Sequence, residues 1–335
     1  MQMKAAFKQG RTVTVRDHTL PPITPDQVRL RVETCGVCGT DLHDRPGEEE
    51  TESGFGHEMA GTVLEVGARV STVAPGDRVA VESASACGFC TPCRNTEQEL
   101  CADLKSFFIN GEFGFQEESV VPFENAIPYD GMSADVASLS EPLAVAVDLV
   151  RVADIRPRQN VILMGPGPIG LMAIPLLKQA GAGRIYVWGR TRRTARIELA
   201  KQFGADEILD ADAVDLATHD FGHRIDRILV TSPPRTLPAA FAAASKGGRV
   251  AFIGIEHGAG AQMTFDVNAF HFKKLRLVAS FASPALQTPL ALELLRDRTV
   301  DGEALISHRY PLDRLAEAME TARSAPDAIK VVVNP

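Results

Sequence analysis

The chain lacks the features that would place it in a membrane or on a nucleic acid. It contains no apolar run of about 18 residues, the length that a membrane-spanning helix needs. It has no basic excess either, because 43 acidic residues outnumber 35 Lys and Arg, whereas nucleic-acid binders need a basic face. Its first residues carry lysines but no apolar segment typical of a secretory signal. We therefore expect a cytoplasmic protein with no nucleic-acid partner and no membrane partner.

Repeats and low-complexity segments are also absent, and two sequence patterns divide the chain. Residues 1–148 contain short alternating strands separated by Pro and Gly, which is typical of a β-rich domain. Residues 149–275 instead alternate strands with helices, which predicts a parallel sheet covered on both faces. The remaining segment is mixed and ends in an expected strand at 330–333. Since 335 residues are too many for one ordinary core, the sequence predicts an α/β protein of two domains.

Cysteines are few, and four of the six form one cluster. Cys87, Cys90, Cys93 and Cys101 follow the pattern C-x2-C-x2-C-x7-C, which offers enough thiols to fill the tetrahedral coordination of one Zn²⁺. Disulfides are disfavoured by the tight spacing and by the expected reducing compartment. The bacterial ferredoxin pattern ends in a three-residue gap followed by Cys-Pro, whereas here the gap is seven residues and Ala102 follows. A closed structural zinc site is therefore predicted.

A glycine-rich motif opens the first helix of the second domain. Gly165, Gly167 and Gly170 match G-x-G-x-x-G directly after an expected strand at 160–164, with Pro168 and Ile169 between the last two glycines. The glycines allow a tight turn, a close approach of the backbone to a pyrophosphate, and close helix–strand packing. The free N–H groups of the helix start favour the anion. The motif predicts a dinucleotide site, to which we also assign two serines, Ser232 and Ser280.

The loop after the next expected strand, at 184–188, bears on which dinucleotide binds. An NAD site usually carries an Asp or Glu at the end of this strand for the ribose 2′-hydroxyl. Here Gly189 stands in its place and is followed by Arg190, Arg192 and Arg193. Guanidinium groups match a 2′-phosphate well, and positive charge at a helix start is unfavourable without an anion. We therefore favour NADP(H) over NAD(H), although a solvated helix start is the alternative.

A second set of metal-ligating residues lies upstream of the thiol cluster. Cys38 stands in the stretch Cys35-Gly-Val-Cys38, and His57 and Glu58 follow about twenty residues later. A thiolate, an imidazole and a carboxylate suit a Zn²⁺ that keeps an open coordination position. The sequence therefore predicts a catalytic metal site in addition to the structural one.

These motifs together resemble the zinc-dependent medium-chain dehydrogenase/reductase family. The similarity is greatest to its sorbitol (L-iditol), threonine and polyol dehydrogenase branch, and it extends over essentially the whole chain, including 140–148 and 273–286. The resemblance implies a GroES-like catalytic domain over 1–148, completed by about 276–335, and a Rossmann domain with a doubly wound parallel sheet over 149–275. It also implies hydride transfer between NAD(P) and a secondary alcohol or ketone, and a homodimer or homotetramer.

The resemblance further implies the roles of single residues in the catalytic site. Cys38 and His57 would bind the catalytic zinc, and either Glu58 or Glu141 would be the third protein ligand. Both carboxylates stay open, because members of the family differ at this point. With the structural site, the chain would bind two zinc ions.

Four neighbouring residues receive supporting roles from the same resemblance. Asp41 would accept a hydrogen bond from the other nitrogen of His57. A proton relay would run through Thr40 and His43. Cys35 would be a packed thiol that binds no metal.

The sequence departs from the family in the segment between Cys38 and His57. This segment is short and carries Glu48, Glu49, Glu50 and Glu52. It is either a solvated loop or an attractor for a cationic substrate such as an amino sugar or aminocyclitol. Two other functions stay open: a metal-free quinone or enone reductase of the same superfamily, against which the metal ligands count, and a non-catalytic zinc- or nucleotide-binding protein.

Overall fold

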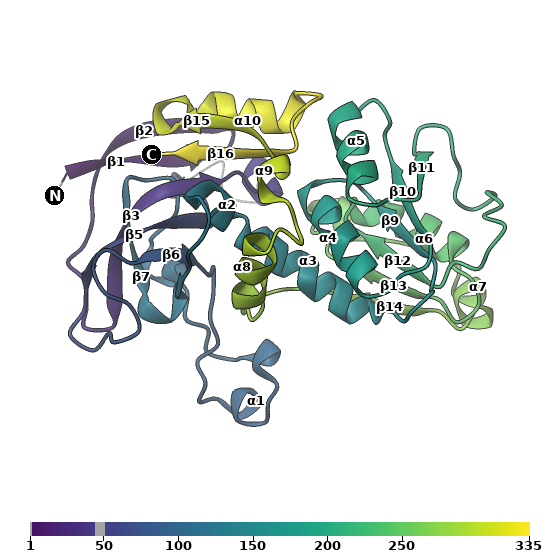
Figure 1. Cartoon of the computed structure of the whole chain (residues 1–335), viewed down its shortest axis with the longest axis horizontal. Coiled ribbons are helices and arrows are strands. Elements are labelled where there is room, and N and C mark those ends of the chain that lie inside the picture. The colour runs from purple at the N-terminus through teal and green to yellow at the C-terminus, as the bar shows by residue number, and fades with distance from the viewer. Residues whose placement is uncertain (1, 44–50) are drawn as a thin grey trace. The chain divides into compact units, whose positions relative to one another are not determined.

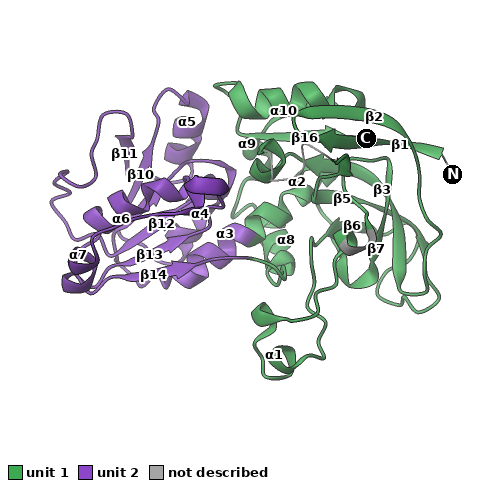
Figure 2. Cartoon of the chain, turned by 180° about the vertical axis from the view of Figure 1, so that it is seen from behind, with its two compact units in different colours: residues 1–144, 282–335 green, residues 145–281 purple. Residues whose placement is uncertain are grey.

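The computed structural model describes residues 2–43 and 51–335, and the chain divides into two compact units (Figure 1). Unit 1 comprises Met1–Ala144 and Ala282–Pro335, and unit 2 comprises Val145–Phe281 (Figure 2). The C-terminal segment therefore returns to the unit that the N-terminal segment begins. Among the described residues, no helix is both long enough and apolar enough to span a bilayer.

Unit 1 is built mainly of strands. They form a three-stranded sheet in the order β2-β1-β4 and a seven-stranded sheet in the order β15-β16-β3-β5-β6-β8, with β7 paired to β3. The strands are β1 (Gln2–Gln9), β2 (Thr12–Thr19), β3 (Gln27–Gly36), β4 (Ser53–Gly54), β5 (Glu58–Val66), β6 (Arg78–Val81), β7 (Glu118–Pro122), β8 (Ala126–Pro128), β15 (Ile306–Pro311) and β16 (Lys330–Asn334).

Short helices complete unit 1. They include η1 (Gly39–Leu42, a 3₁₀ helix), α1 (Thr91–Arg94), α2 (Ala134–Ser138), α8 (Thr288–Arg296), α9 (Gly302–Leu305) and α10 (Leu315–Ser324). A longer helix, α3 (Ser140–Ala153), contains the boundary between the units. The loop that carries α1 stands apart from the strands of this unit (Figure 1).

Alternation of apolar and polar residues explains the central strand β3. Val28, Leu30 and Val32 are buried with exposures of 0–1%, whereas Arg31 between them is exposed. Each such buried side chain stabilises the fold by roughly 1.5–3 kcal/mol. The period of two sends one face of β3 into the core and fixes its register against β5.

Unit 2 contains a six-stranded parallel sheet in the order β11-β10-β9-β12-β13-β14. Its strands are β9 (Val161–Met164), β10 (Ile185–Gly189), β11 (Glu207–Asp210), β12 (Arg227–Val230), β13 (Arg249–Phe252) and β14 (Arg276–Ala279). Its helices include α4 (Pro168–Gln179), α5 (Thr194–Gln202), α6 (Leu237–Ala243) and α7 (Val267–Phe272). All of β9 is fully buried, as expected for a strand covered on both faces. The predicted alternation of strands and helices is therefore confirmed.

Candidate metal and dinucleotide sites

The upstream metal site forms where three strands of unit 1 meet. β3 pairs antiparallel with β5, and this register places Gly36 opposite Glu58. β16 pairs with the other edge of β3, with Val332 opposite Gly36. Since Cys38 follows the end of β3 and His57 precedes the start of β5, strand pairing alone brings the thiol and the imidazole together.

The donor atoms of this site have the spacing that zinc requires. One donor atom each from Cys38, His57 and Glu58 lies within 4.8 Å of the other two. Tetrahedral zinc with its usual bond lengths holds its ligand atoms roughly 3.3–3.8 Å apart. The three residues therefore fit a zinc ion after small adjustments of their side chains. Glu141, at the start of α3, is half-buried and is not one of these three donors.

The charges around His57 also favour a cation. Burial lowers the pKa of His57, but the Cys38 thiolate, Glu141 and Asp41 raise it to well above its ordinary value. Burial raises the pKa of Glu141 to about 7, with Glu58 adding to the rise. Several anionic groups thus share a site that water reaches poorly, and a divalent cation would balance them.

Lys330 is a member of this site that the sequence analysis did not identify. It opens β16, is 2% exposed, and forms an ion pair with Glu58, which is 1% exposed. Burial alone would lower the pKa of Lys330, but Glu58 and the Cys38 thiolate raise it above its ordinary value. The only signal in the sequence is a lysine directly before three valines in the expected strand at 330–333.

Of the residues around the predicted ligands, Thr40 and Asp41 lie on η1, His43 follows it, and Cys35 lies near the end of β3. Asp41 accepts a hydrogen bond from the backbone N–H of Cys38 at 2.9 Å, and its other carboxylate oxygen lies 4.0 Å from Nδ1 of His57. The hydroxyl of Thr40 is buried and has no hydrogen-bond partner among the described residues. His43 is exposed, and its carbonyl accepts a hydrogen bond from Lys8. Cys35 is fully buried, and burial raises its pKa well above the ordinary value.

Gly36 provides a first test of this packing. A Cβ atom at Gly36 would lie 2.2 Å from the Glu58 carboxylate and 3.0 Å from Cε of Lys330, so Gly36→Ala must displace the Glu58–Lys330 pair. We expect this variant to lower kcat/KM at least about tenfold with a loss of bound metal. Gly39→Ala is the matched control, since no heavy atom lies within 4 Å of its added Cβ. Equal activity of the two variants would contradict this account of the site.

The four-thiol cluster is compact. The Sγ atoms of Cys87 and Cys93 are 4.0 Å apart, and those of Cys90 and Cys101 are 3.9 Å apart. The backbone N–H groups of Phe89 and Cys90 donate to the sulfur of Cys87. Backbone hydrogen bonds from Ala102 and Cys93 lower the pKa of the Cys90 thiol to about 6. Four sulfurs at this spacing, supported by N–H donors, fit a closed zinc site with no open position.

The glycine-rich motif lies at one wall of a cavity in unit 2. Gly165 and Gly167 line this cavity of about 480 Å³, together with Gly189 and Ser232. Gly165 has φ of +103°, which favours glycine, and a Cβ at Gly170 would lie 2.2 Å from the carbonyl oxygen of Gly165. Gly170 with its neighbours Pro168 and Ile169 begins α4 and does not line the cavity. Ser280 does not line it either and instead donates a hydrogen bond to Asp148.

Arginines dominate the charge of this cavity. Four arginines line it among the described residues, against one aspartate, Asp212. The arginines are Arg190, Arg193, Arg196 and Arg235. Arg192 is not among the lining residues, although its guanidinium lies 4.0 Å from Asp212. Burial, and then the charge of Arg193, lower the pKa of Arg196 to about 10. Neighbouring cations in a concave site favour an anionic ligand.

The arginine loop is held in place by Asp210, the last residue of β11. Its carboxylate accepts hydrogen bonds from the hydroxyl of Thr191 at 2.6 Å and from the backbone N–H of Asp212. Gly189 is confined as well, because a Cβ there would lie 2.4 Å from the ring of Pro166. Sequence reasoning missed Asp210 and Arg235, since each reaches the loop or the cavity from another part of the chain, and it missed Arg196, which lies in the first turn of α5 just after the loop.

Comparisons with known proteins define the class to which this fold and these sites belong. The alcohol dehydrogenase GroES-like domain matches residues 24–131, and the zinc-binding dehydrogenase domain matches residues 168–297. The chain is 31% identical to the sorbitol dehydrogenase of Bacillus subtilis (strain 168), over 99% of this chain and 97% of that one. The protein is therefore an enzyme that belongs to the zinc-binding alcohol dehydrogenase family.

Two solved structures are similar along their whole length. One is a short chain alcohol dehydrogenase from Escherichia coli CFT073 complexed with NADH, at 25% identity, with a TM-score of 0.89 and coverage of 100% of this chain and 99% of that one. The other is a zinc-binding dehydrogenase from Sinorhizobium meliloti 1021 bound to NADP, at 27% identity, with a TM-score of 0.87 and full coverage of both chains. The predicted GroES-like and Rossmann folds, and the resemblance to the polyol dehydrogenase branch, are confirmed.

Proposed function

We propose that the protein is a zinc-dependent dehydrogenase that transfers hydride between NAD(P) and a secondary alcohol of a polyol, sugar or cyclitol. The observation that carries the proposal is the convergence of donor atoms from Cys38, His57 and Glu58 within 4.8 Å, in a chain of this family. A thiolate, an imidazole and a carboxylate form a three-ligand set that leaves one position for a substrate.

The residues of the site divide the chemistry between them. When bound, zinc supplies a Lewis acid that lowers the pKa of an alcohol hydroxyl. Cys38 and His57 would hold it, with Glu58 or Glu141 as the third protein ligand. The buried hydroxyl of Thr40, which has no partner among the described residues, would accept the substrate proton as it releases its own to His43, and the exposed His43 would pass that proton to water. Unit 2 binds the dinucleotide with its pyrophosphate at the start of α4.

A substrate panel combined with a zinc count distinguishes the proposed dehydrogenase from the two rival functions. A panel of polyols, sugars and simple secondary alcohols would be assayed with both cofactors, alongside a zinc count per chain. We expect two zinc ions per chain. Cofactor reduction should stop when a chelator removes the more weakly bound ion, which is the one at the site of Cys38 and His57. Turnover of quinones or enones without metal would favour the metal-free reductase, and two zinc ions without turnover on any alcohol would favour a non-catalytic protein.

NADP(H) is the proposed cofactor, because the described residues that line the dinucleotide cavity include four arginines and one aspartate. Arg190→Ala is expected to lower kcat/KM for NADP⁺ relative to NAD⁺ by at least about tenfold, since a guanidinium pairs strongly with a 2′-phosphate. Arg192→Ala is the matched control from the same loop. This arginine is outside the lining, and its removal should change the ratio by less than about threefold. A ratio that does not move in Arg190→Ala would contradict the cofactor assignment.

An amino-substituted polyol is the second substrate candidate. It rests on the acidic run of the sequence, of which Glu48, Glu49 and Glu50 lie outside the described residues. Glu52 is described and forms an ion pair with Arg16 at 2.8 Å, so its charge is partly balanced. Comparing kcat/KM for amino and neutral polyols at several salt concentrations tests the idea. The idea predicts a preference for the amine that becomes weaker as the salt concentration rises. Equal kcat/KM for amino and neutral polyols, or a preference that salt does not change, would contradict it.

A further inference from the structure

Lys330 and Glu58 form a buried ion pair inside the metal site. Both side chains are almost fully buried, so bulk solvent has little access to their charges. A buried charge is strongly unfavourable unless an opposite charge or hydrogen bonds satisfy it. Lys330 also donates a hydrogen bond to the carbonyl of Val37 at 2.9 Å. The ammonium group is therefore fixed between the end of β3 and the Glu58 carboxylate.

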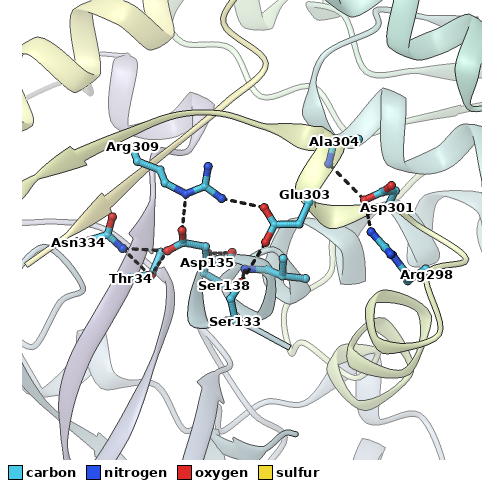
Figure 3. A network of polar contacts seen from close by, with 11 residues as sticks. Thr34, Ser133, Asp135, Ser138, Arg298, Asp301, Glu303, Ala304, Arg309 and Asn334 are labelled. Atoms are coloured by element: carbon cyan, nitrogen blue, oxygen red, sulfur yellow. Dashed lines mark hydrogen bonds and ion pairs between the residues drawn. The ribbon is translucent and has the colours of Figure 1, made fainter. Parts of the chain in front are cut away.

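The backbone around Lys330 is equally constrained. The far end of β16 is tied to its neighbours by Asn334, whose side chain donates to Thr34 at 2.9 Å and to Asp135 at 2.8 Å (Figure 3). Asp135, on α2, also accepts a hydrogen bond from Arg309 of β15 at 2.6 Å (Figure 3). These contacts join β3, β15, β16 and α2, so they hold the strand that carries Lys330 in register.

Glu58 is consequently placed between one cation, the Lys330 ammonium, and the position that a metal ion would occupy. One of its oxygens contacts the Lys330 ammonium, and the carboxylate is also one of the three donors that lie within 4.8 Å of one another. Each cation reduces the pull of the carboxylate on the other, because all three charges lie in a poorly hydrated interior. The Glu58–Lys330 pair is close to neutral as a unit, whereas Glu58 alone would add a full negative charge beside the metal.

We propose that Lys330 is a positioning residue of the metal centre, which holds back Glu58 and so keeps the metal accessible to the substrate alcohol. This inference rests on the proposed function, since it assumes that Cys38 and His57 bind the metal, and of the two open carboxylates it makes Glu141 the third protein ligand. According to this proposal β16, the last strand of the chain, helps to keep one coordination position of the metal open.

Three variants separate this role from a purely structural one. Lys330→Met removes the ammonium charge but keeps the apolar stem, so Glu58 is freed to bind the metal. Zinc affinity of the weaker site should rise at least tenfold while kcat/KM falls at least tenfold. Glu58→Gln leaves the Lys330 ammonium without its anionic partner, and should lower the zinc affinity of the weaker site at least tenfold. The double variant removes both charges and should return the affinity to within about threefold of the wild type.

Zinc affinity is measured by competition with a chromophoric chelator on the full-length holoenzyme, and activity is measured separately. If Lys330→Met lowers both affinity and activity, or if the double variant binds zinc as weakly as Glu58→Gln, the proposal is overturned. Should Lys330→Met fail to fold, the zinc affinities of Glu58→Gln and of the double variant still test the proposal. A wild-type protein with one tightly held zinc and no weaker site would overturn the proposed function as well, and the zinc count distinguishes that outcome.

Discussion

Replacing Cys38 with serine is expected to lower kcat/KM by at least about a thousandfold, equivalent to roughly 4 kcal/mol of transition-state stabilisation. A serine hydroxyl stays protonated at neutral pH and is a poor zinc ligand, whereas a cysteine thiolate is a strong one. Cys38 is only half-buried and follows the end of β3, so the substitution removes a donor without opening a cavity in the core. Activity on the preferred alcohol and zinc content per chain are the measurements.

Cys35 offers a control for this experiment within the same turn of chain. It is 0% exposed and does not belong to the group of donors formed by Cys38, His57 and Glu58. Cys35→Ser should therefore keep both zinc ions and most of the activity, and should lower the free energy of unfolding by roughly 1–3 kcal/mol because it buries a hydroxyl. Loss of a zinc ion from Cys35→Ser, or full activity of Cys38→Ser, would contradict the assignment of the catalytic ligand.

Replacing Cys93 with alanine should release the structural zinc. It should also destabilise the lobe formed by residues 87–101 by at least about 3 kcal/mol. Zinc contributes roughly 10–16 kcal/mol to isolated zinc-finger peptides, and less is expected here because the rest of unit 1 already folds. The lobe has little core of its own: Cys87 and Cys93 are buried, whereas Phe89 and Leu100 are 77% and 61% exposed. Zinc count, chemical denaturation and limited proteolysis between residues 87 and 101 are the measurements.

Thr91→Ala provides the comparison in this lobe, because Thr91 is an exposed residue at the start of α1. It should keep both zinc ions and change the free energy of unfolding by less than about 0.5 kcal/mol. If Cys93→Ala keeps two zinc ions and the wild-type resistance to protease, the four-thiol cluster is not a structural metal site.

Elements with strong local patterns were predicted well from the sequence. The expected strands at 160–164 and 184–188 correspond to β9 and β10. Each is a short apolar run between turn residues, because strands of a parallel sheet are buried on both faces. In contrast, β2 is polar along most of its length and gave no comparable signal, since its pairing with β1 depends on a neighbour rather than on its own burial.

The sequence by itself determined the chemistry that depends on short spacing. The four thiols between Cys87 and Cys101 and the motif beginning at Gly165 predict their ligands because a few residues of backbone fix the distances between the groups. Strand pairing in the tertiary structure decided the rest. Only the register of β3 with β5 and β16 places Lys330 against Glu58, and only the parallel sheet brings Asp210 to the arginine loop. No short sequence motif links residues that lie so far apart in the chain, so their contact follows from the packed sheet alone.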